Sequence, residues 1–415
     1  MKFIAATFLC LIALINTATA ETLDWATRPN ISILSPAAPD VATPGVITVT
    51  SSGVGSGSTS ARRIEIQPAG ALDTHTGIIL SEMDATTDNL TVFNTTTLAF
   101  TNSLGASSPV YNLCFTVIDI DGSATTSSAG SSFNDIVQFG PVPTSSPTIG
   151  SNVTYNAGTG RATSNGNYLS DTTGDLRVCY AGPVNSVTIQ HIAGGAVGTN
   201  PTNEYIGIDD LTYDPPPTIT LTKVSNGAVG GFTFNGDNGF GAAQTITTVT
   251  SGVGVAGATR TLAAASTATT ITETIPAGYA LASATCTGMG AGGTATPNLA
   301  TGALVLNTAA TAANSAIACT FTNTKLPTIA LTKISNGGVG PFVFNGDNGF
   351  GAAQTITTVT SGVGVAGATR TLAAASTATT IAETIPSGYV LTAASCSGIG
   401  AGTATPNLAA GTIAL

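Results

Sequence analysis

The C-terminal half of the chain repeats itself, and this repeat constrains the fold more than any other feature. Residues 234–271 return unchanged as residues 344–381, an offset of 110 positions in a chain of 415 residues. A fixed period indicates tandem copies of one structural unit. Because about 110 residues is the size of a whole domain, we expect two copies of one small domain rather than a solenoid.

Proline-containing segments separate the parts of the chain. The sequences PPP at 215–217 and KLP at 325–327 predict short, stiff linkers. We therefore expect four parts, a signal peptide, an N-terminal β-sandwich, a first repeat and a second repeat, at residues 1–20, 21–214, 217–324 and 327–415. The second copy ends at Leu415, which corresponds to the strand-like run around Leu304, so we expect this copy to be truncated.

The N-terminus predicts export. Lys2 precedes an apolar run at 3–15, and Ala18-Thr19-Ala20 forms a small-residue cleavage site, which is the layout of a secretory signal peptide. The run is shorter than the roughly 20 residues that a spanning helix needs, although a retained anchor helix is the alternative. No other stretch resembles a membrane span. We expect a mature chain that starts near Glu21 and is secreted or displayed on the cell surface.

The composition excludes several classes of function. Charged residues make up 8% of the chain, and 11 basic against 21 acidic residues give a net charge of −10. No basic stripe is present, so nucleic acid is excluded as a partner. With 2 His and 1 Trp there is little material for acid–base chemistry on an external substrate, and we expect no enzyme of that kind.

Short runs in which apolar residues alternate with Thr or Ser predict an all-β protein. About seven such runs in each repeat, separated by Gly, Asn and Asp clusters, favour a β-sandwich. Further runs between residues 21 and 214 predict one larger sandwich of the jelly-roll type. We expect the Ser/Gly-rich residues 51–60 to form a loop.

Three polar residues of the first repeat lie on the apolar face of their strands. Residues two apart in a strand share a face, and by this rule Lys223, Glu273 and Asn323 all have apolar neighbours on their own face. Burial lowers the pKa of an amine and raises that of a carboxyl group. A neutral Lys is a nucleophile, and a protonated Glu can polarise an amide carbonyl. The three residues are therefore candidates for a Lys–Asn isopeptide bond, formed with loss of ammonia.

A structural alternative stands beside the cross-link. Lys223 is also typical of a solvated edge strand that blocks aggregation, and Glu273 is then its ordinary ion-pair partner. The second repeat has the counterparts Lys333 and Glu383 but no acceptor strand, so we expect no cross-link there.

Three motifs resemble one known family. LTK at 221–223, ETIPAGY at 273–279 and FTN at 321–323 are similar to motifs of the prealbumin-like, Cna B-type (SpaA-like) repeat domains of bacterial adhesins and pilins. The resemblance covers 217–323 and, as far as it goes, 327–415. It implies a prealbumin/immunoglobulin-like sandwich in which Lys223 is the nucleophile, Glu273 the catalytic acid and Asn323 the acceptor of an autocatalytic isopeptide bond.

The cysteines fit an exported chain. Cys286 and Cys319 lie within one repeat and are candidates for a disulfide, which is permissible after export. Cys114 and Cys179 either pair or remain two separate buried thiols. Cys396 corresponds to Cys286 but has no partner in the second repeat.

Several aspartates of the N-terminal region lie at the ends of strand-like runs. Asp119, Asp121, Asp135, Asp209 and Asp210 follow or end strand-like runs, which makes them candidates for Ca²⁺ ligands. Their spacing does not match an EF-hand, and solvated loop acids are the alternative. The run IDDL at 208–211 resembles the last strand of jelly-roll modules that bind carbohydrate or calcium.

The two histidines, His75 and His191, lie far apart, and no Ser or Cys motif accompanies them. No cofactor is therefore firmly expected, and Ca²⁺ is the one candidate.

These features together predict an exported bacterial surface protein with a structural or adhesive role. The repeats would act as rigid spacers, and the N-terminal region would contact a glycan or a host or cell-surface protein. The alternative is a secreted calcium-dependent carbohydrate-binding protein that acts through its N-terminal domain.

Overall fold

The computed structural model describes residues 20–34, 39–43, 45, 47–56, 61–72, 75–84, 93–102, 105–122, 134–165, 172–194 and 204–415. These residues form β-strands, turns and the short 3-10 helices η1 (Trp25–Thr27) and η2 (Thr172–Gly174), so the predicted all-β class is confirmed. The predicted signal peptide lies outside the described residues except for Ala20. Within the described ranges, no helix is long and apolar enough to cross a membrane.

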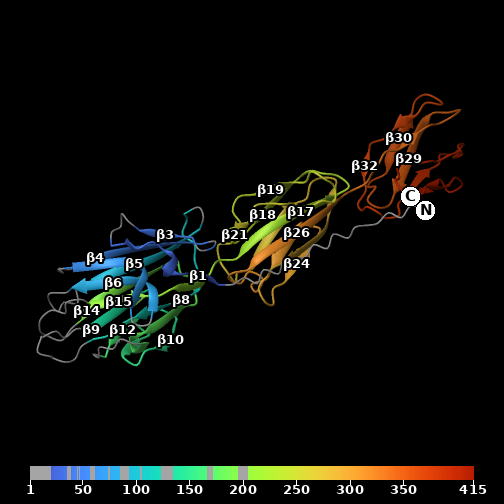
Figure 1. Ribbon diagram of the computed structural model, residues 1–415. Coiled ribbons are helices and arrows are strands. Elements are labelled where there is room, and N and C mark those ends of the chain that lie inside the picture. Colours follow the sequence, from blue (N-terminus) through green and yellow to red (C-terminus); the bar gives the residue numbers. More distant parts are fainter. Residues whose placement is uncertain are drawn as a thin grey trace, which may run out of the picture.

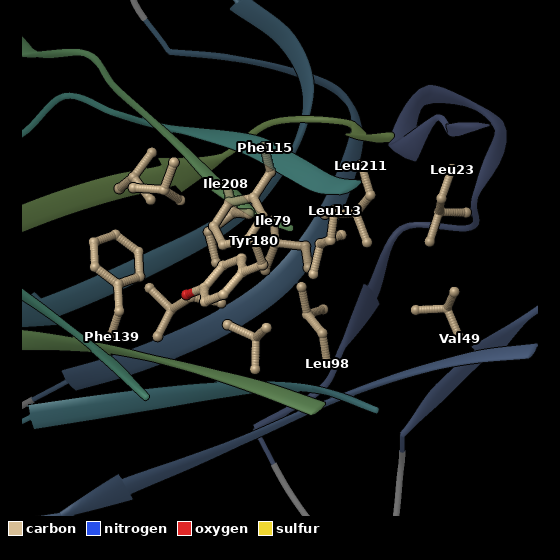
Figure 2. Close-up of a cluster of buried hydrophobic side chains, with 14 of the residues drawn as sticks. Leu23, Val49, Ile79, Leu98, Leu113, Phe115, Phe139, Tyr180, Ile208 and Leu211 are labelled. Atoms are coloured by element: carbon tan, nitrogen blue, oxygen red, sulfur yellow. The ribbon is translucent and has the colours of Figure 1, made fainter. Parts of the chain in front are cut away.

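Two large sheets form the N-terminal region (Figure 1). The first has nine strands: β1 (Glu21–Leu23), β2 (Ile31–Ser32), β5 (Ala61–Leu72), β6 (His75–Asp84), β8 (Tyr111–Ile118), β10 (Ser145–Ile149), β13 (Leu176–Tyr180), β15 (Glu204–Ile208) and β16 (Leu211–Asp214). The second has seven: β3 (Asp40–Ala42), β4 (Thr48–Ser56), β7 (Phe93–Thr101), β9 (Asn134–Gly140), β11 (Val153–Asn156), β12 (Arg161–Ser164) and β14 (Ser186–Gly194). One hydrophobic core joins both sheets, and Figure 2 shows Phe115, Tyr180 and Phe139 converging within it.

The prediction of a loop at residues 51–60 is wrong for residues 51–56. Residues 51–56 belong to β4, which pairs with β7 over its full length. Gly53 explains the unusual composition, because a Cβ at this position would lie 2.8 Å from Cδ1 of Ile64 on the facing sheet. The small residues allow the two sheets to approach closely here. Residues 57–60 lie outside the described ranges.

The first repeat is a sandwich of two five-stranded sheets. One contains β17 (Thr218–Asn226), β20 (Val255–Ala256), β21 (Arg260–Thr261), β23 (Tyr279–Thr287) and β26 (Ala316–Lys325). The other contains β18 (Gly231–Gly236), β19 (Gln244–Thr247), β22 (Thr269–Thr274), β24 (Ala295–Asn298) and β25 (Ala303–Leu306). The first and last strands, β17 and β26, are parallel neighbours, and β23 pairs with the other edge of β26.

The second repeat keeps one of these sheets and only parts of the other. Its five-stranded sheet contains β29 (Gly340–Gly346), β30 (Gln354–Thr358), β33 (Thr380–Thr384), β34 (Thr405–Asn407) and β35 (Thr412–Ala414). Two short pairs replace the second sheet, β27 (Thr328–Ile329) with β32 (Arg370–Thr371) and β28 (Thr332–Lys333) with β31 (Val365–Ala366). Figure 1 shows the three parts of the chain following one another in a row.

Candidate isopeptide site

Three strands of the first repeat bring Lys223, Glu273 and Asn323 together. Lys223 lies on β17, Asn323 lies on the adjacent β26, and Glu273 lies on β22 of the facing sheet. Their exposed fractions are 0%, 0% and 1% for Lys223, Asn323 and Glu273. The side chains therefore point into the core, as the alternation along each strand predicts.

The three side chains form one hydrogen-bonded cluster. The Nζ of Lys223 lies 2.6 Å from Oδ1 of Asn323 and 3.1 Å from Oε1 of Glu273. The Nδ2 of Asn323 donates to the same Oε1 at 2.8 Å. The amine, the carboxamide and the carboxyl group thus contact one another in pairs, and the amine lies against the carbonyl oxygen of the amide.

The surroundings of the cluster are apolar. The Nζ of Lys223 lies 4.4 Å from the ring centroid of Phe232, and it also donates a hydrogen bond to the backbone oxygen of Phe321 at 3.3 Å. Since β17 has a neighbour on both edges, the interpretation of Lys223 as a solvated edge-strand residue is wrong. Within the described structure, Oε2 of Glu273 is buried with no hydrogen-bond partner.

Burial moves both ionisable groups toward their neutral forms. Desolvation lowers the pKa of the Lys223 amine, although the charge and hydrogen bond of Glu273 oppose the shift. Desolvation likewise raises the pKa of the Glu273 carboxyl, against the opposing effects of Lys223 and Asn323. A neutral amine next to a protonated carboxyl is the pair that nucleophilic attack on an amide requires.

The second repeat holds the same acid and base in a different arrangement. The Nζ of Lys333 lies 2.5 Å from Oε1 of Glu383, with side-chain exposed fractions of 12% and 7%. Residues 327–415 contain no strand that pairs with β28 as β26 pairs with β17. The cluster therefore consists of an ion pair without a carboxamide.

Two disulfides are present in the structure. Cys286 and Cys319 join β23 to β26 at directly paired positions, and Cys114 and Cys179 join β8 to β13 in the same way. The alternative of two separate thiols at Cys114 and Cys179 is therefore wrong. Cys396 is a free thiol of intermediate exposure.

The structure does not gather the five predicted calcium ligands into one site. Asp135 is fully buried and lies 3.0 Å from Nε2 of His191, whereas Asp209 pairs with His75 at 2.8 Å. Asp210 accepts a hydrogen bond from the backbone nitrogen of Trp25.

Asp121 is buried, and its backbone nitrogen donates to the Asp135 carboxylate at 3.3 Å, while Asp119 has a positive φ of 62°. In the part of the chain that the structure describes, no group of three or more His, Cys, Asp or Glu residues is arranged to hold a metal ion.

One buried cluster of the N-terminal region was missed by the sequence reasoning. His191 lies 3.2 Å from Oγ of Ser81 and 3.0 Å from Asp135, so a serine does accompany this histidine. Ser81 and His191 are 110 positions apart and lie on different sheets. No local motif could have indicated the contact.

Comparison with known proteins supports the resemblance of the repeats. Residues 219–325 and residues 329–415 each match the family model of a prealbumin-like fold domain, which confirms the predicted class of both repeats. No curated protein matches the chain. The chain is also similar to a solved bacterial adhesin from Mobiluncus mulieris containing intramolecular disulfide, isopeptide and ester bond cross-links. That similarity has 12% identity and a TM-score of 0.26, and it covers 59% of this chain and 91% of the adhesin.

Proposed function

We propose that this chain is an exported, surface-displayed protein with a structural or adhesive role, and that an internal Lys223–Asn323 isopeptide bond braces its first repeat. The observation that carries the proposal is the fully buried contact of Lys223, Glu273 and Asn323. A structural spacer gains from such a brace, because it has to keep its fold under load.

The bond follows from simple acyl transfer. The neutral amine of Lys223 attacks Cγ of Asn323, and Glu273 serves as the acid and base that moves the protons. Glu273 then carries a proton from the amine to the departing nitrogen, which its Oε1 already contacts at 2.8 Å. One C–N bond forms, one C–N bond breaks, and one ammonia leaves. Glu273 ends in the state in which it began.

The position of the bond suits a load-bearing module. The polypeptide enters the first repeat through β17 and leaves it through β26, and these two strands are parallel neighbours. A covalent bond between them carries tension directly from one to the other. The residues between positions 223 and 323 are then protected from extension.

The junction before the first repeat also supports a spacer role. Asp214 accepts hydrogen bonds from Asn112 on one side at 2.7 Å and from Asn314 on the other at 3.4 Å. The hydroxyl of Tyr111 accepts a hydrogen bond from the backbone nitrogen of Ala265 at 2.8 Å. These contacts tie the N-terminal region to the first repeat. They would therefore hold the two parts in a fixed relative orientation in addition to transmitting force between them.

The disulfides and the predicted signal peptide support export. We assign contact with a glycan or a surface protein to residues 21–214, because the repeats have the simpler role of spacers. No specific observation favours the calcium-dependent carbohydrate-binding alternative.

Single-molecule force spectroscopy on the full chain tests the proposal. With the bond in place, the 100 residues between Lys223 and Asn323 stay hidden when the first repeat unfolds. In Lys223→Met they become available, except for the 33 residues inside the Cys286–Cys319 disulfide. The expected gain is roughly 220–240 Å of contour length, at about 3.3–3.6 Å per residue.

Lys333→Met is the matched control and leaves the extension of the first repeat unchanged. An equal extension in wild type and Lys223→Met would contradict the brace. Surface display is tested separately by labelling intact cells with an antibody to the chain, and an absence of label on intact but not on lysed cells would contradict it.

A further inference from the structure

The N-terminal region contains a second buried polar cluster that the proposed function does not use. Ser81 on β6, Asn94 on β7, Asp135 on β9 and His191 on β14 have exposed fractions of 1%, 1%, 0% and 1%. Ser81 belongs to the nine-stranded sheet and the other three to the seven-stranded sheet. The cluster therefore bridges the two layers of the sandwich.

The four side chains form a continuous hydrogen-bonded chain. The Oγ of Ser81 lies 3.2 Å from Nδ1 of His191, and Nε2 of His191 lies 3.0 Å from Oδ1 of Asp135. The Nδ2 of Asn94 donates to Oγ of Ser81 at 3.2 Å and to the backbone oxygen of Glu82 at 3.0 Å. Because Oγ already accepts from Asn94, it is free to donate its own proton to the imidazole.

This order of contacts is that of an activated nucleophile. A hydroxyl next to an imidazole that is held by a carboxylate can pass its proton to the ring and attack a carbonyl carbon. Burial lowers the pKa of His191 to about 3, so its ring is neutral before the step. Asp135 lies 3.0 Å from Nε2 of His191 and orients the ring, and burial raises the pKa of its carboxyl group well above the ordinary value.

Burial determines what such a serine can attack. At 1% exposure, Ser81 has no access to an external substrate. The carboxamide that touches it is that of Asn94, whose Oδ1 is buried and has no hydrogen-bond partner in the described structure. An unpaired buried amide oxygen costs free energy, and an ester carbonyl, which is a weaker acceptor, reduces that cost.

We propose that Ser81 and Asn94 form an intramolecular ester bond that joins the two sheets of the N-terminal sandwich. Oγ of Ser81 attacks Cγ of Asn94, and the serine proton passes to His191. His191 then returns the proton to the leaving nitrogen, so that one C–O bond forms, one C–N bond breaks and one ammonia is released. The dry interior protects the product, because an ester hydrolyses only where water reaches it.

The bond would add to the brace of the first repeat without depending on it. It lies in a different part of the chain, uses a hydroxyl nucleophile and produces a different linkage. It would fix β6 to β7, which follow one another along the chain but lie in opposite sheets. Both layers of the N-terminal region would then unfold only together.

Peptide mass spectrometry of the full, reduced and denatured chain tests the ester. A protease that cuts after Glu and Asp cleaves at Glu82, between the two residues, so an ester leaves two peptides joined. We expect a joined pair about 17 Da lighter than the sum of its peptides, as loss of ammonia requires. Neutral hydroxylamine separates the pair into free Ser81 and a hydroxamate at Asn94, whereas it leaves the Lys223–Asn323 amide intact.

Two variants complete the test. Ser81→Ala removes the joined pair and leaves the cross-link of the first repeat in place. Ser51→Ala is the matched control, because Ser51 is equally buried at 1% but its Oγ has no partner in the described residues. Separate, unmodified Ser81 and Asn94 peptides from the wild-type chain would overturn the ester proposal, whatever the state of Lys223.

Discussion

The two repeats share an identical stretch of sequence but differ in structure. Residues 234–271 and 344–381 are the same, and the acid and the amine occur in both copies. In the first repeat Lys223 is completely buried, whereas Lys333 in the second is 12% exposed. Tyr279–Thr287 is a strand, but the corresponding residues 389–397 are not.

The difference between the repeats identifies β26 as the element that completes the site. This strand lies between β17 and β23, supplies Asn323, and contributes Ile317, Cys319 and Phe321 to the core. Where no strand occupies that place, Lys333 and Glu383 form an ion pair without a carboxamide. The chemistry of the trio is therefore a property of the complete sandwich and not of the local motifs.

The largest expected effect comes from removing one member of the buried trio. Lys223→Met removes both the proposed cross-link and the buried partner of Glu273, and should lower the stability of the first repeat by at least about 3–5 kcal/mol. Lys333→Met removes one member of a partly exposed ion pair and should lower the stability of the second repeat by about 1 kcal/mol. Hydrogen exchange of peptides within 218–232 and 328–342, which differ in sequence, measures the two repeats separately in the full chain.

The double variant Lys223→Met/Glu273→Gln supplies the control for this comparison. Replacing both charged groups removes the unpaired carboxyl and should restore part of the loss. Equal losses in Lys223→Met and Lys333→Met would contradict the claim that β26 changes the energetics of the pair.

Removal of the disulfide in the first repeat should have the next largest effect. The Cys286–Cys319 bond closes a loop of 33 residues, which corresponds to roughly 3–4 kcal/mol in the chain-entropy model. Cys286→Ala/Cys319→Ala should lower the opening free energy of β23 by that amount. Cys396→Ala is the control, since this thiol is free, and it should change little. A similar loss in both variants would argue against the role of the bond.

A matched pair of glycines probes the contact with β26 directly. Gly288 and Gly398 both have a positive φ, 69° and 71°. A Cβ at Gly288 would lie 2.0 Å from the backbone oxygen of Ala316 at the start of β26, whereas a Cβ at Gly398 meets nothing within 4 Å. Gly398→Ala should cost about 1–2 kcal/mol for the left-handed conformation alone.

Gly288→Ala should cost about 1–3 kcal/mol more, because the strand has to shift. Thermal unfolding followed by peptide-level exchange compares the two variants. Equal costs would mean that β26 does not pack against Gly288 as the structure shows.

The smallest expected effect is a pH dependence confined to the N-terminal region. Burial tends to lower the pKa of His75, but its contacts with Asp175 and Asp209 prevail and raise it. A raised folded-state pKa adds stability that is present in full below the unfolded value of about 6.5 and is lost as pH rises through the folded-state pKa.

Hydrogen exchange at β6 measured between mildly acidic and mildly basic pH checks this expectation. His191 lies in the same region, and because its pKa is lowered to about 3, it makes the region lose stability on acidification below about 6.5. The contribution of His75 is therefore the difference between wild type and His75→Asn, and the second repeat, which has no His, serves as the internal reference. If the wild type gained no stability relative to His75→Asn on acidification, the prediction would be contradicted.

The burial of Lys223, Glu273 and Asn323 could be predicted because the pattern that indicates it lies within each strand. Lys223, Glu273 and Asn323 each share a face with apolar neighbours, and the same periodicity is observed in the burial pattern. β6, in contrast, does not show the alternation that predicts a strand. Ile79 faces the main core, while Ile78 and Leu80 pack in a separate cluster on the opposite face, so apolar residues follow one another directly.

The contact of Ser81 with His191 could not be predicted for a different reason. It depends on how two sheets face each other, and a period-two pattern carries no information about the register between sheets. The same reason explains why the sequence could not show which of the five aspartates lie together. Several of the five aspartates do lie next to the end of a strand. The strands belong to two different sheets, however, so their ends do not all meet in one place.

Tryptic mass spectrometry of the full chain tests the central claim most directly. Trypsin cuts at Arg260, between Lys223 and Asn323, so an isopeptide bond leaves two peptides joined and prevents cleavage at Lys223. We predict that joined pair, about 17 Da below the sum of its parts and resistant to hydroxylamine, as an amide formed with loss of ammonia requires. The same digest should release residues 326–333 through normal cleavage at Lys333. Normal cleavage at both lysines, with an unmodified Asn323 peptide, would contradict the account.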